Sequence, residues 1–186
     1  MKQTYIDFLG ILFVLIFCSF TLISLILYCS YYNYNPFVNQ YDVMSKLGTG
    51  RGAVYFNTGL IISGYVGTFM CYERYKNINK VLTIIGVISM CSLLLVGCFP
   101  MPIPIHGFFA ALMFSTMWLF FLVYSIVERS LSLIFMLVLF SIFSFISMAL
   151  TEWIIFFAVN GWIVLTSMKF YYKKTKMYYK VQNIYK

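Results

Sequence analysis

Only a few residues of this 186-residue chain could do chemistry within its apolar segments. An ionisable side chain in a membrane region is energetically costly, so it is a functional candidate by default. His106 is the single histidine, and Glu152 is the acid that lies between two long apolar runs. The amides of Asn57 and Asn160 lie in other apolar runs, and Ser45 lies in a polar segment ahead of Asn57. The search for a site therefore begins at these positions.

The residue types argue against metal chemistry and leave catalysis as the weaker hypothesis. A zinc site normally needs three or four protein ligands, whereas the chain has one histidine and five acids, and its five cysteines form no C-x-x-C pair. No metal or other cofactor is therefore expected. Ser45, His106 and Glu152 are the residue types of a catalytic triad, but no oxyanion motif accompanies them.

The composition is that of an integral membrane protein. Hydrophobic residues make up 62% of the chain, charged residues only 10%, and the mean hydropathy is +0.90. A soluble domain carries about 25% charged residues. The net charge of +8 does not indicate nucleic-acid binding, because the basic residues fall between apolar runs and in the C-terminal tail.

The elements that must position the candidate residues are transmembrane helices. A helix needs about 20 residues to cross the hydrocarbon core. The uncharged runs predict an all-α bundle of six such helices at approximately 8–28, 54–72, 81–99, 103–127, 131–150 and 153–170. We predict one domain over 1–170 and a basic, aromatic cytoplasmic tail over 171–186. The first run is too long for the apolar core of a signal peptide, so it is expected to be retained.

The division between the last two predicted helices rests on length. A single helix over 131–170 would be about 60 Å long, twice the thickness of the hydrocarbon core. A turn at Thr151 and Glu152 divides the stretch nearly in half and places the charge at an interface.

The distribution of lysine and arginine predicts the orientation. With six helices, the side that holds both termini carries 11 of the 13 basic residues, and the other side carries only Lys46 and Arg51. Basic residues accumulate on the cytoplasmic side. We therefore predict a multi-pass protein of the cell membrane with the N- and C-termini in the cytoplasm.

This topology predicts a polar pocket in the outer leaflet. His106, Glu152 and Asn57 would each lie near the outer start of a helix, beneath the first external loop, which carries Ser45. Simpler roles remain open for each: a solvated interfacial histidine, an acid stabilised by a helix dipole, and an amide bonded across helices. If His106 and Glu152 came within about 4–6 Å, each would favour the charged form of the other.

Two further patterns predict contacts with other helices and with the membrane surface. Small residues that recur every four positions let helix backbones approach closely, and they predict central helices; these residues are Gly59, Ser63 and Gly67 in one run and Gly107, Ala111 and Ser115 in another. In the tail, a basic face indicates an interfacial helix on the anionic inner leaflet; its residues are Lys169, Lys173, Lys176 and Lys180. A solvated basic end is the alternative for the tail.

Several short motifs resemble those of a known family. They are S-K-L-G at 45–48, F-N-T-G-L-I-I-S-G at 56–64, and G-C-F-P at 97–100 followed by His106. In this order they resemble the prokaryotic membrane-protein family called Domain of Unknown Function 998, in which an S-x-L-G loop, an F-N-x-G-L-x-x-x-G helix and a G-x-F-P…H segment recur.

The resemblance covers roughly residues 40–170 and implies a six-helix membrane protein. Glu152 resembles an acidic position that opens the last helix in many members. The chain departs from the family after F-P, where it has prolines and members often have acids, so no acidic role there is implied. The family has no assigned function to pass on.

Together these patterns predict a non-catalytic membrane protein that binds a lipid or another membrane subunit through the outer pocket. Passive transport of a small amphiphile is one alternative; coupled transport would need charges in mid-span or internal repeats, and neither is evident. A membrane-embedded lipid hydrolase is a weaker alternative. Cys29 and Cys98 are expected at the outer ends of two helices, as unpaired thiols rather than as a disulfide.

Overall fold

The computed structural model describes residues 3–32, 44–128, 141 and 152–168. Within these ranges the chain is all-α, as predicted. The elements are α1 Gln3–Tyr32, the short 3-10 helices η1 Met44–Gly48 and η2 Gly50–Gly52, α2 Ala53–Tyr75, α3 Lys80–Cys98, α4 Ile105–Val127, and an α-helix at Glu152–Met168.

Four of these helices, α1 to α4, are long and apolar enough to cross a membrane, and helix Glu152–Met168 is apolar but shorter. The protein is therefore a multi-pass helical membrane protein. The predicted helix at 131–150 lies outside the described residues except for Ser141. The tail at 171–186 and the residues Lys169, Lys173, Lys176 and Lys180 also lie outside them. The described ranges hold five α-helices, and the predicted count of six stays a prediction.

The outer surface of α1 carries large apolar side chains that a soluble protein would bury. Phe8, Leu15, Leu22 and Ile26 are each between 57% and 59% exposed. A hydrocarbon environment removes the free-energy cost of exposing such side chains to water. The exposed face of α1 is therefore lipid-facing.

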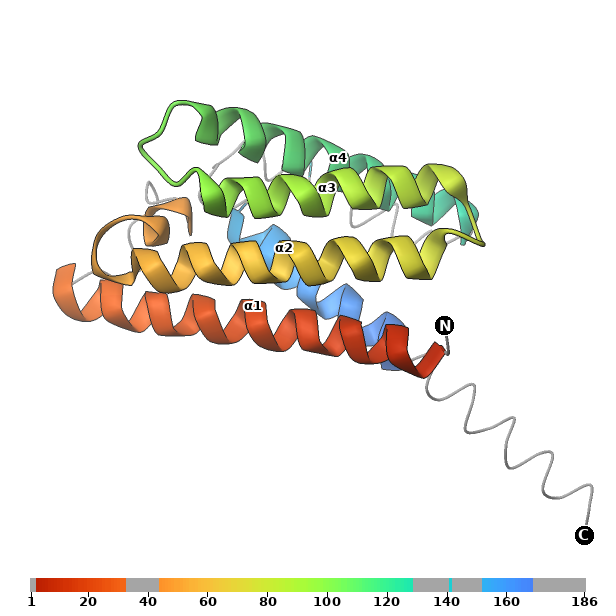
Figure 1. Cartoon of the computed structure of the whole chain (residues 1–186), viewed down its shortest axis with the longest axis horizontal. Helices are drawn as coiled ribbons and strands as arrows, with labels where there is room; N and C mark the ends of the chain where they lie inside the picture. The colour runs from red at the N-terminus through yellow and green to blue at the C-terminus, as the bar shows by residue number, and fades with distance from the viewer. Residues whose placement is uncertain (1–2, 33–43, 129–140, 142–151, 169–186) are drawn as a thin grey trace, which may run out of the picture.

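Helices α1 to α4 run antiparallel to their neighbours in chain order (Figure 1). One end of this array, called here the η1 end, holds η1, η2 and the link between α3 and α4. The opposite end, called here the Arg74 end, holds the start of α1 and the end of α2. Helix Glu152–Met168 contacts α1 through Phe156 and Phe17 and contacts α4 through Trp162 and Phe120.

Small residues of α2 allow close packing with its two neighbours. A Cβ at Gly59 would lie 2.5 Å from Cβ of Phe20 on α1, and one at Gly64 would lie 2.6 Å from the backbone nitrogen of Leu94 on α3. A Cβ at Gly67 would lie 2.6 Å from the sulfur of Met90, and Ser63 is fully buried. The glycine side of α2 thus lies against other helices.

The small residues of α4, which were expected to pack against other helices, lie on an exposed face of α4 within the described residues. Within the described part of the chain nothing lies within 4 Å of a Cβ at Gly107, and Ala111 and Ser115 are exposed. Met113, Met117 and Phe120 form the buried face of α4 instead. Four-residue spacing predicts that three residues share a helix face, but it carries no information on which helix that face meets.

Alanine substitutions at Gly64 and Gly107 should show the difference between a closely packed glycine and an exposed one. Gly64→Ala should lower the free energy of unfolding by about 1–3 kcal/mol, because its Cβ would overpack the backbone of α3. Gly107→Ala should be neutral or stabilising by up to about 1 kcal/mol, because alanine favours helix and the site is open. Denaturation in mild detergent measures both, and equal stability of the two variants would contradict this packing.

Candidate functional site

The segment that carries Ser45 is anchored to the ends of α1 and α2. Ser24 Oγ on α1 donates a hydrogen bond to the Leu47 carbonyl at 3.2 Å, and Asn57 Nδ2 on α2 donates to the Gly48 carbonyl at 3.1 Å. Leu47 is only 2% exposed. A Cβ at Gly48 would lie 2.8 Å from Asn57 Oδ1, so a side chain at position 48 would displace the Asn57 amide. η1 is therefore held in a defined position at this end of the bundle.

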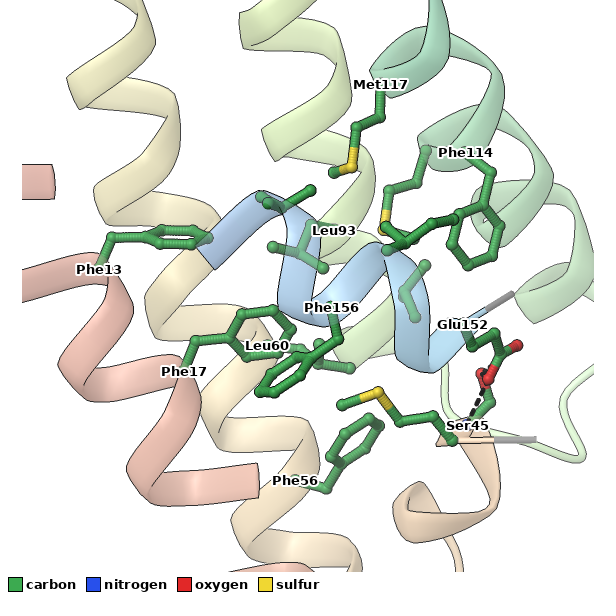
Figure 2. Close-up of a pocket in the computed structure, with 15 residues that line it drawn as sticks. Phe13, Phe17, Ser45, Phe56, Leu60, Leu93, Phe114, Met117, Glu152 and Phe156 are labelled. Atoms are coloured by element: carbon green, nitrogen blue, oxygen red, sulfur yellow. Dashed lines mark hydrogen bonds between the residues drawn. The ribbon is translucent and has the colours of Figure 1, made fainter. Parts of the chain in front are cut away.

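Glu152 accepts hydrogen bonds from Ser45, 107 positions away in the sequence. The backbone N–H of Ser45 donates to Oε2 at 2.9 Å, and Ser45 Oγ lies 3.2 Å from Oε1 and 3.4 Å from Oε2. Glu152 is 7% exposed. Figure 2 shows this contact at the start of helix Glu152–Met168, at the edge of a pocket. The contact ties the helix to η1.

An apolar cavity of about 60 Å³ begins at this contact. Side chains from α1, η1, α2, α3, α4 and helix Glu152–Met168 surround it (Figure 2). Glu152 and Ser45 supply its polar groups; the remaining lining residues are Phe13, Phe17, Met44, Phe56, Leu60, Leu93, Val96, Met113, Phe114, Met117, Ile155, Phe156 and Val159. Because one water needs about 10–15 Å³ of such space, the cavity is several waters in size.

The predicted pocket residues do not all meet in this cavity. His106 is buried at the start of α4, where its Nδ1 donates to the Phe99 carbonyl at 2.8 Å. Asn57 is bonded to Gly48. Neither residue lines the cavity. Each side chain instead donates a hydrogen bond to a backbone carbonyl. A carbonyl left without a donor inside a membrane protein would cost free energy.

The geometry does not assemble the Ser45–His106–Glu152 triad. Ser45 donates directly to Glu152, and within the described residues His106 bonds to neither of them. A triad requires the histidine between the hydroxyl and the acid. Asn160, the other apolar-run amide, donates to the Phe156 carbonyl of its own helix at 2.7 Å.

The cysteines and acids of the described residues offer no metal site. No group of three His, Cys, Asp or Glu side chains gathers within these ranges. Cys29 and Cys98 are free thiols, as expected.

A second buried polar cluster lies at the Arg74 end. Arg74 Nη1 donates to Thr166 Oγ1 at 3.1 Å, and Nη2 donates to Ser167 Oγ at 3.2 Å and to Asp7 Oδ1 at 3.5 Å. The Arg74 and Asp7 side chains are only 3% and 11% exposed. The cluster therefore joins α1, α2 and helix Glu152–Met168 by charge-assisted hydrogen bonds.

Sequence reasoning missed this cluster because both charges lie just beyond the predicted spans. The helices extend further: α1 begins at Gln3 rather than 8, and α2 continues to Tyr75 rather than 72. Arg74 was expected in a loop, as one of the cytoplasmic positive charges. The sequence did hold a signal for this cluster. Asp7 lies near the start of one helix, and Arg74 lies near the end of the next, antiparallel helix.

Several residues of the sequence motifs lie together at the η1 end. Ser45 bonds to Glu152, and Gly48 bonds to Asn57. A Cβ at Gly97 would lie 2.7 Å from the Asn57 carbonyl oxygen, so this glycine lets α3 approach α2. Comparison with known proteins finds no matching family model, no matching curated protein and no matching solved structure. The family resemblance thus stays a prediction that rests on the motifs.

The Arg74 cluster predicts a strong double-mutant coupling. Arg74→Met should lower the free energy of unfolding by about 3–5 kcal/mol, because it leaves the Asp7 carboxylate buried without its guanidinium partner. The double variant Asp7→Asn/Arg74→Met should recover part of that loss. Denaturant titration in mixed micelles measures all of these variants.

Lys76→Met is the matched control, because it breaks the ion pair with Glu73 at a partly exposed lysine. Lys76 is 32% exposed and Glu73 8%, so water reaches the lysine end of this pair, and Lys76→Met should lose less stability than Arg74→Met. Additive effects of the Asp7 and Arg74 substitutions, with no coupling between them, would show that the cluster is not the stabilising contact described here.

Proposed function

We propose that this protein is a non-catalytic membrane protein that binds a single-chain amphiphile between its helices. One observation carries the proposal: an apolar cavity that runs from the Glu152–Ser45 contact into the bundle. Ligand sites in proteins are concave, mostly apolar, and have a few placed polar groups that orient the ligand. The cavity has this composition.

The position of the cavity supports an amphiphile rather than a water-soluble ligand. Its walls are phenylalanine, methionine and aliphatic side chains, and methionine adapts its shape readily to flexible apolar ligands. The cavity is large enough for a stretch of hydrocarbon chain, and the remainder of the ligand would lie between helices toward lipid. An apolar space of this kind attracts hydrocarbon more than water.

The proposed orientation puts the polar end of this site in the outer leaflet. The η1 end carries Lys46 and Arg51, whereas the Arg74 end carries Arg74, Lys76 and Lys80 within the described residues. The positive-inside rule favours the Arg74 end as cytoplasmic. Both termini would then be cytoplasmic, and the site would open from the outer half of the bilayer.

The lack of an assembled triad favours binding over hydrolysis. A serine that donates to a carboxylate at 3.2 Å is oriented by it, but a glutamate in direct contact is a weak base toward a hydroxyl. Passive movement of the same amphiphile is the second candidate.

Filling the cavity should displace the ligand. Val159→Phe adds a ring to the cavity wall from a residue that is 4% exposed, so it should reduce co-purified amphiphile by tenfold or more. Mass spectrometry of lipid extracts from protein purified in mild detergent measures the bound amphiphile. Retention of the same molecule at the wild-type ratio would exclude the cavity as its site.

Leu165→Phe is the matched control on the same helix, because Leu165 is 69% exposed and lies outside the cavity lining. It introduces the same aromatic side chain at an exposed position and should leave the bound amphiphile unchanged. A similar loss in both variants would indicate a general defect of folding rather than a filled site.

The proposed orientation can be tested in intact cells. In a variant whose five cysteines are replaced, Arg51→Cys should react with a membrane-impermeant maleimide from outside. Asn77→Cys, in the exposed link between α2 and α3, should react only after the membrane is permeabilised. External labelling of Asn77→Cys in unbroken cells would reverse the orientation.

A further inference from the structure

We infer that the ligand's head group is a hydrogen-bond donor, an ammonium in preference to a hydroxyl, and that anionic amphiphiles are excluded. This inference rests on the proposed function and assigns the chemistry of the polar end of the same cavity. It follows from the charge of the Glu152 carboxylate and from the hydrogen-bond acceptor sites that Glu152 and Ser45 leave free for a ligand.

The first step is the charge at the cavity's polar end. Glu152 is 7% exposed, and within the described residues no Lys, Arg or His side chain pairs with it. Its hydrogen-bond partners are neutral groups of η1, the N–H and hydroxyl of Ser45 and the backbone N–H of Met44. Burial of a carboxylate without a cationic partner is costly, and a positive charge brought by a ligand would offset that cost. Charge complementarity therefore favours a cationic head.

The second step is the remaining hydrogen-bonding capacity. A carboxylate has about four acceptor sites and no donor. Ser45 uses its N–H and its hydroxyl hydrogen on Glu152, so its oxygen retains only acceptor capacity. Both polar groups of the cavity can thus accept and neither can donate. An ammonium has three donors and meets this demand best, whereas a hydroxyl meets part of it.

The third step excludes the common anionic heads. A carboxylate or phosphate head has acceptors where the site needs donors, and its charge has the same sign as that of Glu152. The cation cannot come from a basic side chain of the cavity lining, because the lining has none. A fatty acid would therefore lose its head-group contacts on entering with its head toward Glu152.

Three probes with one chain length test the head group directly. Dodecylamine, dodecanol and dodecanoic acid are added to the purified protein in an uncharged detergent at neutral pH, and the shift in thermal midpoint is recorded. A ligand that binds only the folded state raises the midpoint in proportion to its affinity. The Val159→Phe variant supplies the baseline for non-specific effects of each probe on the micelle.

The expected order is a clear stabilisation by the amine, a smaller one by the alcohol and none by the acid. This order would run against the bulk electrostatics, since the chain's net charge of +8 attracts the acid and repels the amine. Glu152→Gln keeps the shape of the side chain and removes its charge, so it should reduce the ratio of amine to alcohol affinity by tenfold or more. Leu165→Phe should keep the wild-type order.

Failure of the head-group assignment is distinguishable from failure of the binding proposal. If the acid stabilises as well as the amine, or if Glu152→Gln leaves the ratio unchanged, the assignment is wrong; the cavity stands provided that Val159→Phe still abolishes stabilisation. If no probe stabilises the wild type beyond the Val159→Phe baseline, both proposals are overturned.

Discussion

The hydrogen bonds between Glu152 and Ser45 connect two segments that lie 107 positions apart in the sequence. They fasten the beginning of helix Glu152–Met168 to η1, and η1 is itself fastened to α1 by Ser24 and to α2 by Asn57. In a bilayer the hydrophobic effect does not drive helices together. Packing and interhelical hydrogen bonds such as these therefore determine how the helices are arranged. This contact fixes the start of the helix, where the cavity has its polar groups.

A second polar cluster holds the same helix near its other end. Thr166 and Ser167 accept from Arg74, whose guanidinium also bonds to Asp7. A Cβ at Gly10 would lie 2.6 Å from Ser167 Oγ, so a glycine of α1 admits the helix there. Between the two ends its contacts are aromatic, with Phe17 on one side and Phe120 on the other. Side chains such as these can repack without leaving polar groups unsatisfied, which suits a site for a flexible ligand.

Most residues of the sequence motifs stabilise the fold at the η1 end. Gly48 and Gly97 permit close approaches, Asn57 and His106 satisfy backbone carbonyls, and Leu47 fills a buried position. Ser45, Phe56, Leu60 and Glu152 are the residues of these segments that also line the cavity.

Sequence alone determined the membrane class, the all-α fold and, within a few residues, α1 to α4, because long uncharged runs leave a helix as the available way to satisfy the backbone in lipid. It also identified Ser45, Asn57, His106 and Glu152 as unusual, since polar groups are costly there. Only the tertiary structure decided which of them meet. Ser45 and Glu152 do, whereas Asn57 and His106 turn to nearby carbonyls, and Arg74 and Asp7 pair at the opposite end. The physical reason is that helical periodicity gives a residue's depth and face but not the rotation and tilt of its neighbours. Those depend on contacts between side chains far apart in the sequence, such as the fit of Gly64 against α3 and the openness around Gly107.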